Sequence, residues 1–135
     1  MKGSVKNMKH LIWILAVTTV SFLWMPGSAE GHHGYAAFDT KTVLTFEGTV
    51  AEFHWTNPHC VVDFDVKDAR GQVRMWHGEM SSLAHLTPKG WTAATLEPGD
   101  KITITGYPGK NNVPSLWVTK ILLPGGKELK VEAEN

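Results

Sequence analysis

Residues 42–55 read TVLTFEGTVAEFHW, and they contain a change of phase that decides the fold. Apolar residues occupy the even positions from Leu44 to Val50 and the odd positions from Ala51 to Trp55. Because side chains alternate between the two faces of a strand, the apolar set can change parity only where an extra residue is inserted. We therefore predict one long strand over this stretch, with a β-bulge near Val50 and Ala51. A first strand that bends in this way is what a small closed barrel requires.

The turn after this strand is fixed by Asn57 and Pro58. Proline presets its own φ and moves the residue before it away from helical conformations. A second strand is predicted from His59 to Val66, with His59 and Asp63 on the face that points outward. The opposite face, which we assign to the core, carries Cys60, Val62, Phe64 and Val66.

The remaining elements follow in a simple order. Further strands are predicted over residues 72–79, 101–107, 115–123 and 127–131, with a short helix over residues 80–86. Three strands, a short helix and then two strands are the order of the OB-fold, a Greek-key barrel. We therefore predict an all-β protein, a five- to six-stranded OB-fold-like Greek-key barrel with one short helix between strands three and four. An open sandwich or another small barrel is the alternative.

The beginning of the chain does not fit this barrel. Three lysines precede an apolar run over residues 11–24, and a Pro-Gly-Ser-Ala segment follows it. This is the order of a secretory signal peptide, and the run is short for a membrane span, which needs about 20 residues. We predict cleavage after Ala29, or as late as Gly31, and hence a bacterial periplasmic or secreted protein with no membrane span after cleavage; an uncleaved anchor is the alternative. The chain then divides into signal peptide, amino-terminal arm, barrel and tail (residues 1–29, 30–41, 42–131 and 132–135).

Composition argues against several classes of function. From Glu30 onward the chain has 10 basic and 13 acidic residues, a net charge of −3. The basic residues are scattered and form no stripe that could neutralise phosphates, so nucleic acid is not an expected partner. The sequence also lacks Gly-x-Ser-x-Gly, phosphate-loop, His-Glu-x-x-His and Cys-x-x-Cys motifs. We therefore predict a binding protein and no enzyme.

Histidines are the candidate functional residues. Six of them fall outside the signal peptide: His32, His33, His54, His59, His77 and His85. Histidine is the commonest metal ligand, and an exported chain without paired cysteines would use imidazole for copper or zinc. We predict a transition-metal site, for copper first, with His32, His33 and His59 as ligands and His54 as a fourth. The last two flank a tight turn, where residues of neighbouring strands can lie side by side. His77 and Glu79, which share a strand face, form an alternative pair.

Either cleavage site exposes a chelating amino terminus. A cut after Gly31 leaves His32 first, and its free amine and ring nitrogen can then bind one metal ion together. A cut after Ala29 leaves the sequence Glu-Gly-His at the terminus. Its amine, two amides and imidazole form a square-planar set for Cu(II) or Ni(II).

Ordinary alternatives exist for the same residues. Adjacent histidines near a terminus often have no function, and His54 and His59 could instead only hydrogen-bond the backbone of the loop. Met75, Met80 and Cys60 would add soft ligands for Cu(I), although these residue types are more often buried in the core. The alternative function is a metal-free module that binds an exported protein or a small ligand through this loop and through exposed aromatic side chains.

Several short motifs together resemble a known family. They are HHGYAAFD at 32–39, GTV at 48–50, WTNPH at 55–59, WHGE at 76–79, GW at 90–91, LEPGD at 96–100 and TGY at 105–107. They resemble a family of small bacterial exported proteins that is described as a domain of unknown function. The resemblance covers nearly the whole mature chain and implies export and a compact β-barrel, with no established activity. The family more often has Ser-Phe in place of Gly34-Tyr35, and its histidine pair more often follows the cleavage site directly.

Overall fold

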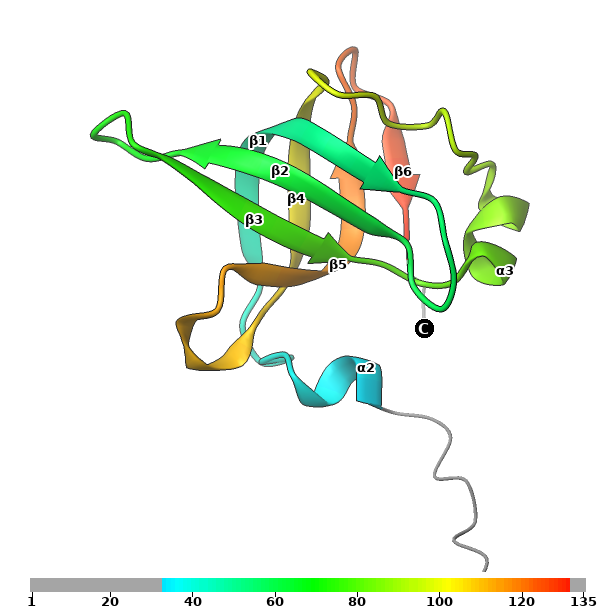
Figure 1. The fold of residues 1–135 in the computed structure, drawn as a ribbon, viewed down its shortest axis with the longest axis horizontal. Helices are drawn as coiled ribbons and strands as arrows, with labels where there is room; N and C mark the ends of the chain where they lie inside the picture. The colour runs from blue at the N-terminus through cyan, green and yellow to red at the C-terminus, as the bar shows by residue number, and fades with distance from the viewer. Residues whose placement is uncertain (1–32, 132–135) are drawn as a thin grey trace, which may run out of the picture. The chain divides into compact units, whose positions relative to one another are not determined.

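The computed structural model describes residues 33–131 (Figure 1). The predicted signal peptide and His32 therefore lie outside the described residues. Six strands follow in order: β1 (Leu44–His54), β2 (Val61–Lys67), β3 (Val73–Glu79), β4 (Lys101–Pro108), β5 (Ser115–Leu122) and β6 (Glu128–Lys130). The short helices are α2 (His33–Ala36), α3 (Leu83–Leu86) and two 3₁₀ turns, Thr87–Lys89 and Lys110–Asn112.

The strands close into a barrel. Their order is β3-β2-β1-β4-β5-β6, and β3 also pairs with β5. The β3–β5 pairing is parallel and all the others are antiparallel. Five strands therefore form a closed ring, and β6 extends it beyond β5. The predicted OB-fold-like barrel, with one short helix between β3 and β4, is confirmed.

The bulge in β1 is where the apolar pattern predicts it. The register between β1 and β2 shifts between Val50 and Glu52. Val50 is buried, and Phe53 packs against the same core although its position has the other parity. Gly48 lies just before the bulge, and a Cβ atom there would lie 2.8 Å from the Phe64 ring. The glycine thus lets that ring pack directly onto the bending strand.

The core contains the side chains that alternation assigns to it. Cys60, Val62 and Phe64 of the second strand region are fully buried, and Trp91 and Leu96 are buried with them. In the third strand the sequence does not decide whether Val73 and Met75 or Trp76 face the core, and the structure places Trp76 against it. Val73 and Met75 of the same strand point outward and are exposed. The outer face of β3 therefore carries its odd-numbered residues.

The first strand begins at Leu44 rather than at Thr42, and two neighbouring elements also start two or three residues later than predicted. β2 begins at Val61 rather than at His59, and α3 begins at Leu83 rather than at Met80. The reason is an additional backbone pairing between the two segments. The amide of Met80 donates to the Cys60 carbonyl at 2.8 Å, and the amide of Cys60 donates to the Ser81 carbonyl at 3.2 Å. This extended pairing delays the helix.

The amino-terminal arm packs on the outside of the barrel. Phe38 forms a β-bridge with Gly109, and its ring lies 5.8 Å from the Trp117 ring, measured between centroids. The Tyr35 ring lies 5.0 Å from the same indole. Trp117 is thereby buried outside the barrel core. In the part of the chain that the structure describes, no helix is long and apolar enough to cross a bilayer.

Candidate functional site

Polar side chains gather on the outer face of β1, β2 and β3. One row across the three strands is Glu52, Asp63 and His77. The next row begins with His54 on β1 and ends with Glu79 on β3. Side chains that lie opposite each other in an antiparallel sheet share a face and are close enough to interact. The register therefore brings two histidines and three carboxylates onto one surface.

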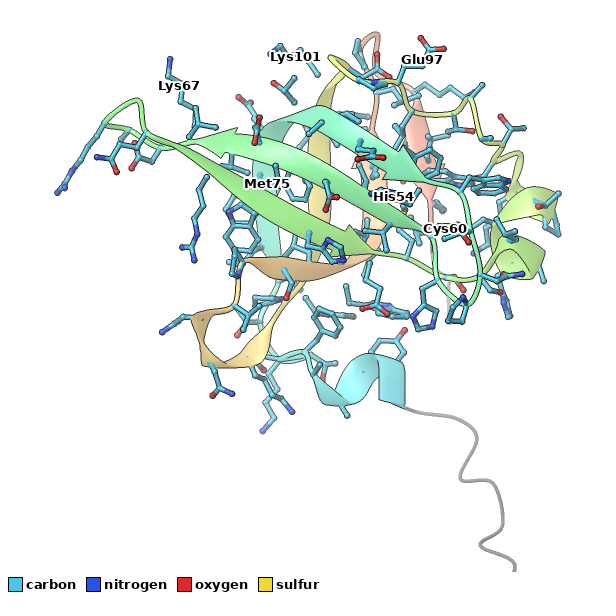
Figure 2. The ribbon with its side chains drawn as sticks, in the orientation of Figure 1. His54, Cys60, Lys67, Met75, Glu97 and Lys101 are labelled. Carbon is cyan, nitrogen blue, oxygen red and sulfur yellow. The ribbon has the colours of Figure 1, made fainter. Side chains whose placement is uncertain are left out.

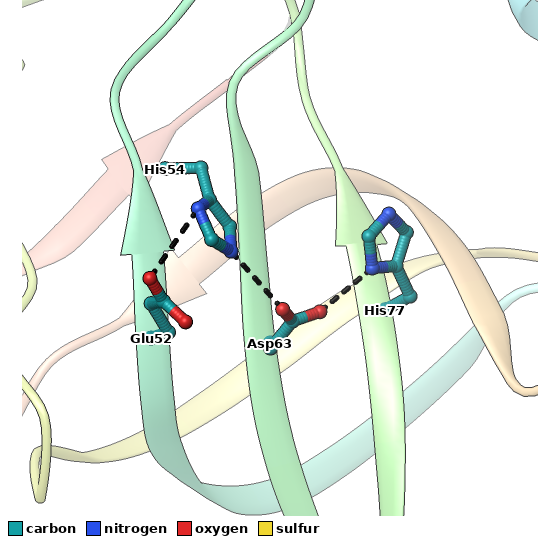
Figure 3. A network of polar contacts seen from close by, with 4 residues as sticks. All are labelled: Glu52, His54, Asp63 and His77. Carbon is teal, nitrogen blue, oxygen red and sulfur yellow. Dashed lines mark hydrogen bonds and ion pairs between the residues drawn. The ribbon is translucent and has the colours of Figure 1, made fainter.

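Asp63 joins two of these histidines, as Figure 3 shows. His54 Nε2 donates to Asp63 Oδ2 at 3.2 Å, and His77 Nδ1 donates to Asp63 Oδ1 at 2.6 Å. The other ring nitrogen of His54, Nδ1, lies 3.6 Å from Glu52 Oε1. We refer to Glu52, His54, Asp63 and His77 as the histidine–carboxylate cluster. An ionised carboxylate only accepts hydrogen bonds, so the ring nitrogens that contact Asp63 are the donors.

Three members of the cluster have the spacing of metal ligands. Glu52, His54 and Asp63 each offer one donor atom, and these atoms lie within 4.8 Å of one another. A neutral imidazole has one ring proton, so His54 Nε2–H leaves a lone pair on Nδ1 that faces the Glu52 carboxylate. That arrangement is favourable only with a proton or a metal cation between the two groups. One imidazole with carboxylates suits a divalent first-row transition metal.

The cluster is accessible from solvent. The side chains of His54 and Asp63 are 39% and 21% exposed, so an ion could enter and leave without a change of fold. The same contacts also tie three strands together, but each surface ion pair contributes at most about 1 kcal/mol to the free energy of unfolding. Stabilisation of the fold therefore does not by itself explain why so many donor groups gather on this surface.

His59 belongs to a different group. It follows the cis Asn57–Pro58 bond, its Nδ1 donates to Glu79 Oε1, and its ring meets Trp117 edge-on at a centroid distance of 5.3 Å. Among residues 33–131, no contact joins the side chains of His54 and His59. The two residues are thus held by separate partners.

The other candidate residues are placed only in part. His33 is the first residue of α2, and its side chain, like the whole of His32, is outside the described structure. His77 and Glu79 share a strand face but have different partners: His77 hydrogen-bonds Asp63, and Glu79 hydrogen-bonds His59. His85 hydrogen-bonds Ser82 within the α3 region, away from the cluster.

Sequence reasoning missed two members of the cluster. Asp63 reads as a solvated carboxylate on an outward strand position, and Glu52 as a polar residue opposite the core. The available signal is the Glu-x-His spacing in β1, because residues two apart on a strand share a face. The contribution of Asp63 depends on the register between β1, β2 and β3.

An open depression on the barrel surface is lined by none of the cluster residues. Its volume is about 650 Å³, and it lies between the bend of β1 and the residues that follow β5. Glu47, Asp65, Lys67 and Lys101 all line it, so its charges are mixed. None of the candidate histidines lines it, and this lining favours no single ligand class.

A family of unknown function, DUF6152, matches residues 21–115. The chain belongs to this family. The matched residues include the whole histidine–carboxylate cluster and extend to the first residue of β5. No curated protein matches the chain. Membership in DUF6152 confirms the resemblance to a family of unknown function and brings no activity with it.

Of the three sulfur-containing residues that could supply a soft ligand, two lie in the core of this DUF6152 protein. Cys60 and Met80 are fully buried. Burial raises the pKa of the Cys60 thiol, and metals bind the thiolate, so this residue is a poor ligand at neutral pH. Met75 is the exception, since it lies on the outer face of β3 and is exposed.

Proposed function

We propose that this DUF6152 protein is an exported periplasmic β-barrel that binds a divalent transition metal ion, copper, and carries or buffers it. The observation that supports this proposal is the set of donor atoms from Glu52, His54 and Asp63 within 4.8 Å of one another. For a given set of nitrogen and oxygen donors, Cu(II) is bound more tightly than the other divalent first-row ions. An accessible site on a sheet surface suits exchange of an ion better than catalysis.

Export rests on the order of charged, apolar and small residues over positions 1–29. The single cysteine is consistent with it, because the barrel needs no disulfide and the metal donors are imidazole and carboxylate groups that are stable to oxidation. His33 precedes Tyr35 by two residues, and the rings of Tyr35 and His59 contact the same Trp117 indole. On the sequence alone, His32 and His33 of the arm and His59 of the loop form a second group of ligands in the same proposal.

The test uses the full-length protein, expressed with its own leader and purified from the periplasmic fraction. Intact mass fixes the amino terminus, and calorimetric titration measures Zn(II) and Cu(II) binding. Zn(II) reports on the barrel because the terminal amine–amide chelate is selective for Cu(II) and Ni(II). His54→Ala and Glu52→Gln should each weaken Zn(II) binding by about tenfold or more. His85→Ala, which removes an exposed histidine elsewhere, is the matched control and should leave binding unchanged.

The outcomes separate the hypotheses. A mass that includes residues 1–29 would contradict export. Zn(II) binding that is equally strong in His54→Ala would contradict the site, and Cu(II) binding that survives in this variant would belong to the amino terminus. If neither ion binds, the metal-free interaction module is the better description. Circular dichroism of each variant verifies that the barrel remains folded.

A further inference from the structure

We infer that the edge of β3 from Val73 to Trp76, the open edge, is a docking site for an extended peptide of a partner protein in which acidic and apolar residues alternate. The peptide pairs with β3 as an additional strand, which is a common way for a sheet to bind a peptide. Docking at this edge does not depend on metal binding. Three observations support it: unpaired backbone groups, the side chains beside them, and the positive charge of the β2–β3 hairpin.

Part of β3 has a neighbouring strand on one side only. β2 pairs with β3 along its whole length, from Val73 to Glu79. On the other side, β5 pairs with His77–Glu79 alone. Within residues 33–131 no further strand pairs with β3, so one side of the backbone from Val73 to Trp76 is unpaired. In Figure 1 the turn end of the β2–β3 hairpin extends away from β5.

The odd-numbered residues of β3 direct their backbone groups away from β2. In an antiparallel pair, residues that exchange hydrogen bonds alternate with residues whose amide and carbonyl point to the opposite side. The even-numbered residues bond across the hairpin, since the Asp68 amide donates to the Gln72 carbonyl at 2.9 Å. The odd-numbered residues point outward, and the His77 amide accordingly donates to the Pro114 carbonyl, outside the hairpin, at 3.0 Å.

Val73 and Met75 are the odd-numbered residues of the open edge. Their two amides and two carbonyls have no backbone partner in the part of the chain that the structure describes. Sheets usually protect such an edge with proline, a bulge or charged side chains. Here the two side chains are apolar and are 62% and 58% exposed. An added strand would therefore gain backbone hydrogen bonds and bury apolar surface together. Figure 2 shows Met75 along β3 and Lys67 near the turn of the same hairpin.

Basic side chains flank the open edge. Lys67, Arg70 and Arg74 are all exposed, and Asp68 is the one acidic residue between them in the sequence. The Asp68 carboxylate already accepts two backbone amides of its own turn, at 2.8 and 2.9 Å. Among residues 33–131, none of the three basic side chains forms an ion pair. The hairpin is thus positively charged and complements an acidic partner.

The two faces of the open edge favour different side chains. Arg74 lies on the face opposite Val73 and Met75, and its Cζ atom is 5.9 Å from the centroid of the Trp76 ring. On the other face Asp65 is paired with Met75 and adds a negative charge. An added strand therefore places acidic residues beside Arg74 and apolar residues beside Val73 and Met75. Because successive strand residues point to opposite faces, the matching peptide alternates the two types.

The test titrates the purified full-length protein, in the presence of EDTA, into a fluorescein-labelled peptide, Glu-Val-Glu-Val-Glu-Val-Glu, and follows fluorescence anisotropy. Met75→Pro removes an outward amide that takes no part in the pairing with β2, a position where an edge strand tolerates proline. Arg74→Glu reverses the charge beside the acidic residues. Each change should weaken binding by about tenfold or more. Lys127→Glu, the same charge change in the turn between β5 and β6, is the control and should leave binding unchanged.

Methylated peptides test the backbone pairing directly. The amides of alternate residues point to the same side of an extended strand, so N-methylation of the valines blocks one side and N-methylation of the glutamates blocks the other. One methylated peptide should lose binding because its methyl groups face β3, and the other should bind like the parent. Equal binding of all three peptides would indicate charge attraction without strand addition and would overturn the inference.

Unchanged peptide binding in Arg74→Glu, or in a folded Met75→Pro, would also overturn it. A wild-type dimer that Met75→Pro converts to a monomer would assign the edge to a second copy of the chain instead. Circular dichroism verifies the fold of each variant, and Arg74→Glu with the methylated peptides suffices if Met75→Pro does not fold. Zn(II) binding should be the same in Arg74→Glu as in wild type, so the proposed function is tested separately.

Discussion

Burial alone determines the role of Cys60. It is the single cysteine of the chain, and its side chain is fully buried between the second strand region and the helix. Its thiol donates weakly to the Thr56 carbonyl at 3.6 Å. The sequence allowed a core residue or a metal ligand, and the structure confirms the core position.

Because the Cys60 thiol is buried, the free energy of unfolding should depend on pH in the alkaline range. Burial raises the pKa of Cys60 in the folded protein above its value in the unfolded chain. The stability that its neutral form contributes is therefore complete below the unfolded pKa, and it is lost as the pH rises through the folded pKa. We expect the free energy of unfolding of wild type to fall more steeply than that of Cys60→Ala between neutral pH and about pH 10. Urea denaturation at a series of pH values measures this, and parallel curves would contradict it.

The members of the histidine–carboxylate cluster were predictable to different degrees. His54 could be predicted as a ligand because it is a histidine on an outward-facing strand position, and in the structure it belongs to the cluster. Asp63 could not, because an aspartate on an outward strand position is usually only solvated. What distinguishes it is that its two oxygens accept hydrogen bonds from histidines of two different strands.

The strands β4 and β5 approach each other unusually closely at Gly106. Their register shifts between Thr105 and Gly106. A Cβ atom at Gly106 would overlap the carbonyl oxygen of Trp117 and lie 2.9 Å from its carbonyl carbon. These atoms belong to the backbone and cannot move aside as a side chain could. Closure of the barrel at this point therefore requires glycine.

Replacement of this glycine should be costly. We expect Gly106→Ala to lower the free energy of unfolding by about 3 kcal/mol, because the strand pair must separate to admit the methyl group. Gly90→Ala is the control. Gly90 has φ +85° and open space around its Cα, so that change should cost only about 1–2 kcal/mol of backbone strain. Urea denaturation measures both. A smaller loss for Gly106→Ala than for the control would contradict the close approach.

Helix α3 illustrates where local patterns were insufficient. The spacing of Leu83 and Leu86 correctly indicated a helix that faces the core, since Leu86 is buried and Leu83 packs against it. Its start was predicted too early because Met80 and Ser81 pair with Cys60. That pairing joins segments about 20 residues apart in the chain, so no local propensity reports it.

The arm and the barrel are held together outside the main core. The Asp39 amide donates to the Pro108 carbonyl at 2.8 Å, and the Lys110 amide donates to the Ala37 carbonyl at 2.9 Å. Phe38 anchors this contact, since its ring is buried against Trp117. Phe38 is not part of the core cluster inside the barrel. The arm should therefore be able to detach without unfolding the strands.

Phe38→Ala tests this independence. We expect amide hydrogen exchange at Asp39 and Lys110 to become about tenfold faster or more, while exchange in the middle of β1 and β2 stays unchanged. Val43→Ala, which alters an exposed apolar residue close to the arm, should change neither region. Faster exchange throughout the barrel in Phe38→Ala would show that the arm and the barrel unfold as one unit.

Several features of this protein were determined by the sequence alone. The change of parity between Val50 and Ala51 required a bulge, a bent first strand and hence a closed barrel. Alternation in the second strand assigned Cys60 and Phe64 to the core and placed Asp63 outside. These features follow from the two-residue period of a strand, which each segment carries by itself.

Only the tertiary structure decided which outward residues meet. His54 and His59 are close in sequence, yet one lies with Glu52 and Asp63 and the other with Glu79. Their separation depends on the register between β1, β2 and β3, which the bulge shifts by one residue. Register is set by hydrogen bonds between strands that are distant along the chain, together with the packing of the closed barrel. No single segment of the sequence contains that information.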